Sequence, residues 1–224
     1  RSAVIASDCG AEVAVVLTKA DRVGERELAR DIDLIREAIG EGVRVVVTTS
    51  VQEGSADLGA LAQVAEARGA LWGEDGVRAV VPKGHTAIVL GESGAGKSTL
   101  LNALLGHEAL ETGAVRESDD AGRHTTVARR MVSLPGAGVI VDAPGLRSLP
   151  LVGHERGLAK VFPEIAEAAR DCRFRDCTHT HEPGCEVRSR FEAGEYSKVR
   201  FDAYVSLAAE MRESAGTLDP DIVL

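Results

Sequence analysis

The chain has 224 residues, of which 44% are hydrophobic and 27% charged, a composition typical of a folded globular protein. Its net charge of −9 argues against a protein that binds nucleic acid through its overall charge, so an RNA contact would need a local basic patch. No apolar run approaches the ~20 residues of a membrane-spanning helix, and no signal peptide opens the chain, so we expect no membrane association.

Strand and helix patterns alternate along the first two thirds of the chain. The opening residues show neither a clear helix cap nor a strand. After them we expect strands at 14–17, 43–47, 77–81, 86–90, 129–134 and 139–141, helices at 25–39, 57–69 and 99–105, and a loop at 106–125. This alternation predicts the α/β class, with a mostly parallel sheet covered on both faces.

The pattern changes beyond about residue 150. A helical stretch at 158–170 leads into a cysteine cluster, and a polar, helix-like tail follows with Phe201, Tyr204 and Val205 on its apolar side. The sequence therefore predicts a small C-terminal helical domain after the α/β domain.

Residues 91–98 read Gly-Glu-Ser-Gly-Ala-Gly-Lys-Ser, a complete G-x-x-x-x-G-K-[ST] phosphate-binding loop between a strand and a helix. Backbone amides of such a loop surround a phosphate, so the pattern indicates a nucleoside triphosphate with Mg²⁺ rather than a chance glycine-rich turn. Lys97 is expected to reach the β- and γ-phosphates, and Ser98 to bind the Mg²⁺. The nucleotide-binding residues predicted here are Gly91, Glu92, Ser93, Gly94, Ala95, Gly96, Lys97, Ser98 and Thr99.

An Asp-x-x-Gly segment follows the strand at 139–141. Asp142 can hold the Mg²⁺ shell, and the Gly145 amide can meet the γ-phosphate, although an Asp-x-Pro-Gly turn after a strand is also common. A threonine hydroxyl upstream of Asp142, at the end of the loop at 106–125 or directly after it, could complete the Mg²⁺ shell. Thr125 and Thr126 are both possible, and we favour Thr126.

The segment Thr18-Lys19-Ala20-Asp21 follows the first strand and has the pattern of a guanine-reading motif. The Asp21 carboxylate can accept hydrogen bonds from guanine N1 and N2, which adenine cannot donate, although it could instead cap a helix. Thr18 stands where GTPases usually have asparagine, and its hydroxyl can still bond to the phosphate-binding loop. After the next strand, Thr49 and Ser50 lie where backbone groups would meet guanine O6.

Three cysteines and one histidine, Cys172, Cys177, His179 and Cys185, have the spacing of a structural Zn²⁺ site, one per chain. His181 is a competing fourth ligand, and reduced buried cysteines or a redox pair are alternatives. Arg173, Arg175, Arg188 and Arg190 are expected to form a basic patch around the site. Cys9 stands apart and is expected to be a buried, inert thiol.

The motifs occur in the order 18–21, 48–50, 91–98, 125–126 and 142–145, together with Gly-Arg-His-Thr-Thr at 122–126 and the cysteine cluster at the end. This combination resembles the RsgA/YjeQ family of small-subunit-dependent GTPases. The resemblance implies a circularly permuted P-loop GTPase domain at 1–150 and a zinc-binding domain at 151–224. It also implies that the family's N-terminal OB-fold, and the first strand of the core, are absent from this sequence.

The same resemblance implies GTP hydrolysis to GDP and phosphate, late in maturation of the small ribosomal subunit, in the cytoplasm and stimulated by the ribosome. The implied partners are GTP, GDP and the small subunit with its rRNA, and we expect a monomer. Leu146 replaces the water-orienting glutamine of Ras-like sites, so His124 is a hypothetical catalytic substitute. An ATP-using P-loop enzyme and a zinc-stabilised RNA-binding module with a structural nucleotide are the alternatives.

Overall fold

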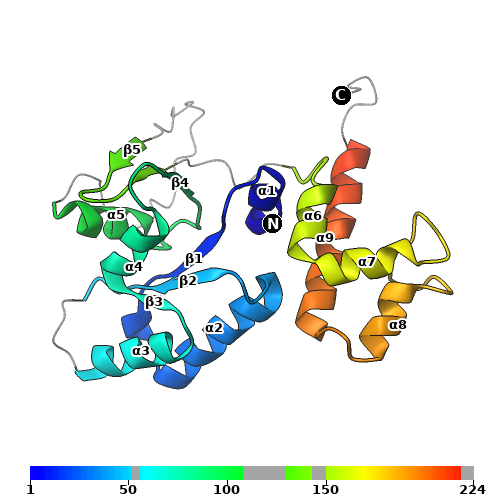
Figure 1. The fold of residues 1–224 in the computed structure, drawn as a ribbon, viewed down its shortest axis with the longest axis horizontal. Coiled ribbons are helices and arrows are strands. Elements are labelled where there is room, and N and C mark those ends of the chain that lie inside the picture. The colour runs from blue at the N-terminus through cyan, green and yellow to red at the C-terminus, as the bar shows by residue number, and fades with distance from the viewer. Residues whose placement is uncertain (52–55, 108–129, 143–149, 218–224) are drawn as a thin grey trace, which may run out of the picture. The chain divides into compact units, whose positions relative to one another are not determined.

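The computed structural model describes residues 1–51, 56–107, 130–142 and 150–217 (Figure 1). Its strands are β1 (Ala14–Leu17), β2 (Arg44–Val47), β3 (Leu71–Trp72), β4 (Thr86–Val89), β5 (Arg130–Ser133) and β6 (Val139–Asp142). Its helices are α1 (Ser2–Asp8), the 3-10 helix η1 (Ala20–Arg22), α2 (Glu25–Ile39), α3 (Ala56–Ala67), α4 (Gly73–Val80), α5 (Lys97–Leu105), α6 (Glu155–Val161), α7 (Pro163–Arg170), α8 (Glu186–Glu192) and α9 (Lys198–Thr217). Among the described helices, none is both long and apolar enough to traverse a lipid bilayer.

The chain forms two compact units, which we call unit 1 and unit 2. Unit 1 contains the described residues within 1–13, 33–43 and 149–224, and unit 2 those within 14–32 and 44–148. This grouping differs from the expected domain at 1–150, because residues 1–13 and 33–43 join the C-terminal segment. Residues 1–13 do so because α1 packs directly on α6, where Lys160 donates a hydrogen bond to the Ser7 carbonyl at 2.8 Å.

The strands of unit 2 form two three-stranded sheets in the described part of the chain. The first has the order β1-β2-β3 and is parallel throughout, while the second has the order β4-β6-β5, with β5 antiparallel to β6. The α/β class is therefore confirmed, and so is the hairpin between β5 and β6. The sequence predicted one sheet, whereas the described strands form two, because no described pairing joins β1 to β4.

Burial also differs between the two sheets. Strand β2 is buried on both faces, since Val45, Val46 and Val47 all lie inside. Residues of helices α4 and α5 pack in one buried cluster with Val46 of β2 and with Val132 and Ile140 of the second sheet. On the second sheet, however, Ile88 of β4 is 56% exposed and Met131 of β5 is 74% exposed. Coverage of both faces is thus correct for β2, whereas β4 and β5 each leave a large apolar side chain exposed in the part of the chain that the structure describes.

Two further expectations about local structure are wrong. Residues 77–80 of the strand predicted at 77–81 belong to helix α4, and Val81 is its C-cap; Val77 and Val81 both pack into the core of unit 2. The opening residues, in which the sequence shows no clear helix cap, form helix α1, and Arg1 at its N-cap makes no side-chain capping hydrogen bond. Cys9, expected to be buried, is exposed because it follows the last turn of that helix.

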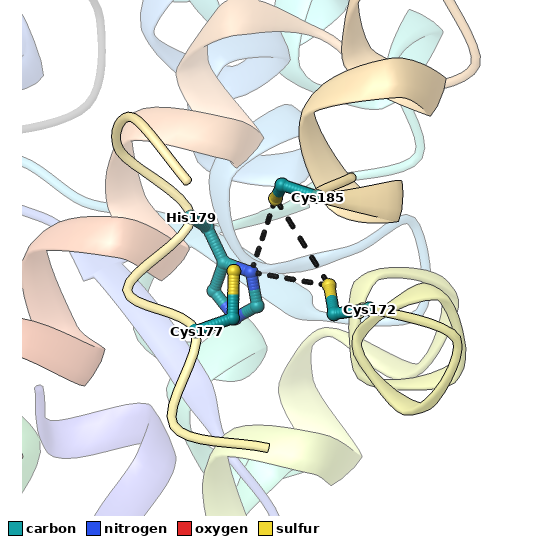
Figure 2. A group of neighbouring side chains, drawn as sticks. All are labelled: Cys172, Cys177, His179 and Cys185. Atoms are coloured by element: carbon teal, nitrogen blue, oxygen red, sulfur yellow. Dashed lines mark hydrogen bonds between the residues drawn. The ribbon is translucent and has the colours of Figure 1, made fainter. Parts of the chain in front are cut away.

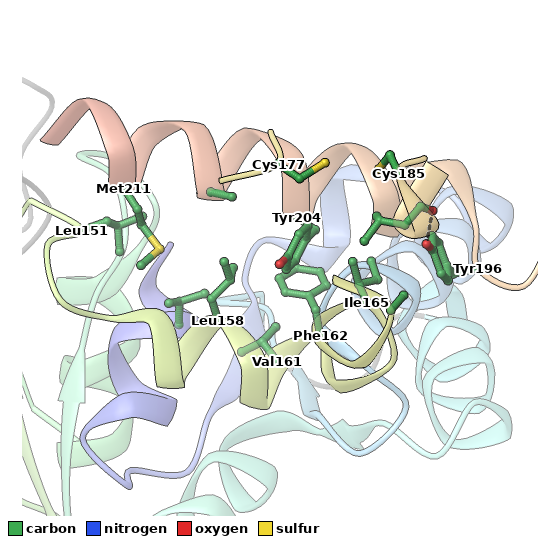
Figure 3. Packing of buried hydrophobic residues seen from close by; sticks show 14 residues of the cluster. Leu151, Leu158, Val161, Phe162, Ile165, Cys177, Cys185, Tyr196, Tyr204 and Met211 are labelled. Carbon is green, nitrogen blue, oxygen red and sulfur yellow. Dashed lines mark hydrogen bonds between the residues drawn. The ribbon is translucent and has the colours of Figure 1, made fainter. Parts of the chain in front are cut away.

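Unit 1 is a helical assembly around an aromatic and aliphatic core (Figure 3). The expected helix at 158–170 is two helices, α6 and α7, which meet at Phe162 and Pro163. The ring of Phe162 packs edge-on against Tyr204 of α9, with ring centroids 5.7 Å apart. The guanidinium carbon of Arg200, also in α9, lies over the Phe162 ring, 4.9 Å from its centroid. The same guanidinium donates to the Val161 carbonyl at 2.7 Å. These contacts fix α9 on the α6–α7 pair.

Gly157 of α6 lets α1 approach its backbone closely. A Cβ at this position would stand 2.2 Å from the Val4 carbonyl oxygen and 2.8 Å from Asp8 Cβ. We therefore expect Gly157→Ala to destabilise unit 1 by roughly 1–3 kcal/mol, the usual range for overpacking, in denaturant unfolding. Gly59→Ala, at an open position of α3, is the control and should stabilise slightly. Equal effects of the two substitutions would contradict the close approach.

Candidate functional site

The phosphate-binding loop connects β4 to α5, as its sequence predicts. Gly94 and Gly96 have φ angles of +76° and +84°, a left-handed backbone that glycine adopts without strain. The Lys97 side chain curls over the loop, where its Nζ donates to the carbonyls of Gly91 at 2.8 Å and Glu92 at 2.9 Å. A loop that wraps around a lysine ammonium in this way places the positive charge of the side chain at the start of α5, where a phosphate would bind.

The segment after β1 contacts this loop, although 75 residues or more separate them in sequence. The Thr18 hydroxyl donates to the Ala95 carbonyl at 2.7 Å, and Lys19 Nζ donates to the Gly94 carbonyl at 2.6 Å. The predicted bond from Thr18 to the loop is therefore present. A Cβ at Gly96 would make only ordinary contact with Thr18 Oγ1, at 3.5 Å, so the left-handed φ angle rather than space favours glycine at this position. The structure thus brings residues 18–21 and 91–98 to one place in unit 2.

A hydrogen bond that the sequence did not reveal orients Asp21. Thr49 donates its hydroxyl to Asp21 Oδ1 at 2.5 Å, and the same hydroxyl accepts from the Val51 amide at 3.1 Å. The Ala20 amide donates to the Thr48 carbonyl at 3.1 Å, which joins the two segments through their backbones. Asp21 itself is exposed, so its carboxylate remains accessible beside the loop that follows β2.

Asp142 ends β6, paired in register with Val89, the last residue of β4. Its Oδ1 is buried and has no hydrogen-bond partner among the described residues. A buried carboxylate oxygen without a donor carries a large desolvation cost, which a cation or its bound water would offset. This acceptor fits the chemistry of a Mg²⁺ shell. His124, Thr125, Thr126 and Gly145, the other predicted residues of this site, lie outside the described residues.

A second group of side chains lies in unit 1, where the predicted residues Cys172, Cys177, His179 and Cys185 gather (Figure 2). Their ligand atoms all lie within 4.8 Å of one another. His179 Nδ1 is 3.6 Å from the Cys172 sulfur and 3.5 Å from the Cys185 sulfur, and those two sulfurs are 4.0 Å apart. Tetrahedral Zn²⁺, with bonds of ~2.3 Å to sulfur and ~2.0 Å to nitrogen, puts sulfur pairs ~3.8 Å and sulfur–nitrogen pairs ~3.5 Å apart. The distances among Cys172, His179 and Cys185 therefore match those of a Zn²⁺ site.

Without a bound cation, the surroundings of the cluster favour a neutral His179 imidazole and a protonated Cys177 thiol. Burial lowers the pKa of the His179 imidazole, and the Arg212 charge adds to this effect. Burial also raises the pKa of the Cys177 thiol to about 12, helped by Cys185 and Cys172. A bound cation would reverse the preference of the thiols, because metal coordination deprotonates them. His181, the competing ligand, is exposed and contacts Thr180 Oγ1 at 2.8 Å instead.

The expected basic patch around the cluster is smaller than predicted. Arg190 pairs with Glu186 at 3.0 Å and Asp171 at 3.4 Å, and Arg188 pairs with Glu192 at 3.3 Å. Carboxylates thus compensate two of the four arginines. Arg173 and Arg175 are exposed, and they flank the exposed ring of Phe174; the Arg173 guanidinium carbon lies 5.4 Å from the centroid of this ring. An arginine–aromatic pair of this kind can stack on a nucleic-acid base.

The described sites define an α/β protein with a P-loop and a separate three-cysteine, one-histidine cluster. Residues 1–152 match the family model described as RsgA GTPase, and the chain belongs to this family.

The curated relatives extend the match through the cysteine cluster. The chain is 39% identical over 223 residues to the small ribosomal subunit biogenesis GTPase RsgA of Streptomyces coelicolor, covering 98% of this chain and 55% of that protein. It is 37% identical over 211 residues to RsgA 2 of Lactiplantibacillus plantarum, covering 94% and 53%. It is 45% identical over 150 residues to RsgA of Opitutus terrae, covering 65% and 41%. The chain thus spans about half the length of these relatives, and its resemblance to the RsgA/YjeQ family is confirmed.

Proposed function

We propose that this protein hydrolyses GTP in the maturation of the small ribosomal subunit, with turnover stimulated by that subunit. The contacts of Thr18 and Lys19 with the loop at 94–95 carry the proposal, because they hold the base-reading carboxylate of Asp21 beside a phosphate-binding loop. The names of the relatives support the ribosomal role. We also propose a circularly permuted GTPase domain at 1–150, followed by a zinc-binding domain at 151–224; the family match over 1–152 supports the extent of the first.

The roles of the residues follow from their chemistry. Lys97 neutralises charge that develops on the transferred phosphate, and the amides of the loop hold the β-phosphate. Ser98 and Asp142 would hold Mg²⁺, with Thr126 as the proposed third ligand. When bound, that cation supplies positive charge to the phosphate oxygens. His124 remains the proposed water-positioning residue, and Gly145 the proposed donor to the γ-phosphate.

The zinc cluster would be structural, because four protein ligands leave no open coordination position. We propose that it supports a contact with rRNA through the exposed turn at 173–175, where Phe174 and two arginines can stack on a base. The protein acts, in this proposal, as a cytoplasmic monomer that cycles between GTP and GDP.

Replacing Asp21 with asparagine tests the nucleotide preference. An amide in place of the carboxylate cannot accept from both guanine N1 and N2, so we expect GTP affinity to fall roughly 100-fold and xanthosine triphosphate to bind better. Competition binding with GTP, xanthosine triphosphate and ATP measures this. Asp75→Asn, on the exposed surface of α4, is the matched control. Wild-type binding of ATP as tight as that of GTP would favour the ATP-using alternative instead.

Phosphate release with and without purified small subunits tests the activity itself. Stimulation by the subunits supports the proposed GTPase. An absence of stimulation, in this chain and in a version with the full length of its relatives, would instead favour the RNA-binding module with a structural nucleotide.

A further inference from the structure

The histidine of the metal cluster has an unusual backbone. His179 has a φ angle of +62°, in the left-handed region that residues other than glycine seldom adopt. It is buried, and its Nδ1 faces two sulfurs of the cluster (Figure 2). A conformation of this kind persists where interactions of the neighbouring residues fix it.

Those neighbours are held by one carboxylate. Glu182 Oε1 accepts from the Thr178 amide at 2.9 Å and from the Thr178 hydroxyl. Glu182 Oε2 accepts from the amides of Thr180 and His181, both at 3.2 Å. One oxygen therefore binds the residue before His179, and the other binds the two residues after it. These bonds hold the pKa of the Glu182 carboxyl well below its ordinary range, led by those from Thr178.

A second contact braces the same loop from α8. Arg188 Nη1 donates to the Thr180 carbonyl at 2.8 Å, and the Arg188 amide donates to the Cys185 sulfur at 3.4 Å. The loop that carries His179 is thereby joined to the helix that begins at another ligand of the cluster.

We propose that Glu182 is a positioning residue for the metal cluster: its two oxygens fix the left-handed turn that aims His179 Nδ1 at the cysteine sulfurs. The inference rests on the proposed zinc site and goes beyond it, because Glu182 is not one of the four ligands. Without this carboxylate the turn would relax toward ordinary backbone angles, and the nitrogen would leave the tetrahedral position. Groups that orient metal ligands in this way typically change metal affinity by 10–100-fold.

Glu182→Gln separates positioning from bulk, because glutamine has nearly the same shape. Its single carbonyl oxygen can accept from Thr178 or from the Thr180 side, but not from both. Its amide nitrogen would face N–H donors on the remaining side, and two donors cannot bond to each other. The substitution therefore releases one side of His179 while it leaves the four ligands in place.

The test uses the full chain loaded with Zn²⁺ or with Co²⁺, whose absorption spectrum reports ligand geometry. We expect Glu182→Gln to weaken Zn²⁺ affinity by roughly 10–100-fold in chelator competition, and to change the Co²⁺ d–d bands. Glu167→Gln removes the same charge from the exposed surface of α7 and should leave both readouts unchanged. Thr178→Val removes the hydroxyl with its bonds to Glu182 and Thr180 Oγ1 and keeps the amide bond to Glu182. It should therefore give a smaller loss, and it serves as the test if Glu182→Gln does not fold.

The outcomes separate this inference from the site on which it rests. Stoichiometric metal in the wild type, with affinity and spectrum unchanged in Glu182→Gln, would overturn the positioning role and leave the zinc site standing. A wild type that binds no Zn²⁺ would overturn the zinc site itself, and the role of Glu182 with it.

Discussion

Lys97→Ala is expected to reduce GTP turnover at least ~100-fold, the scale on which the loss of one preorganised charge-stabilising group acts. The ammonium of Lys97 is held over the phosphate-binding loop by the carbonyls of Gly91 and Glu92. Its charge is therefore already in position when the phosphates arrive, and little reorganisation is needed. Alanine removes this charge and leaves two carbonyl oxygens pointing toward the place where negatively charged phosphates would bind. We expect GTP affinity to fall as well.

Phosphate release with saturating GTP and small subunits measures the first effect, and titration with a fluorescent GTP analogue measures the second. Lys83→Ala, in the exposed turn before β4, removes an equal charge from the same unit and should change neither. Turnover by Lys97→Ala at the wild-type rate would mean that the loop does not hold the reacting phosphate.

Local patterns in the sequence predicted most of the elements that carry the site. The strand at 14–17, the helix at 25–39 and the phosphate-binding loop all lie where their residue patterns place them. The segment at 77–81 was predicted wrongly for a definite reason: a short run rich in valine fits a buried strand and a buried helix equally well. Packing decides the outcome, because Val77 of α4 and Val81 at its C-cap lie in one buried cluster with residues of α5.

In the candidate site, too, residue spacing predicted some features, while others depend on contacts that form only in the folded chain. The spacing of the cysteines was enough to predict their cluster, since the ligands lie within 14 residues of one another. The contacts of Glu182 with the backbone around His179 were missed, because they depend on a left-handed turn at His179 that no residue pattern predicts. The bond from Thr49 to Asp21 was missed for a related reason, since it joins two strand ends 28 residues apart. An acidic residue between two metal ligands was the available signal for Glu182.

Cys177→Ser is expected to abolish Zn²⁺ binding and to unfold much of unit 1. Cys177 and Cys185 belong to the same buried cluster as Phe162, Ile165 and Tyr204, so the metal site is part of the core (Figure 3). Structural Zn²⁺ sites supply on the order of 10 kcal/mol of binding free energy, which is comparable to the whole stability of a domain. Loss of the metal also leaves the remaining thiols and His179 buried without a cation. The effect on stability should therefore exceed that of any single core truncation.

Metal analysis of the purified protein and thermal unfolding measure the two effects, with Cys9→Ser as the control because Cys9 is an exposed thiol outside the cluster. We expect one Zn²⁺ per chain in the wild type and in Cys9→Ser, and none in Cys177→Ser. Chelation of the wild type should reproduce the lowered melting temperature, since it removes the same binding free energy without a substitution. A Cys177→Ser protein that loses its metal yet melts like the wild type would show that the helical core holds unit 1 together by itself, and the cluster would then need a role other than stability.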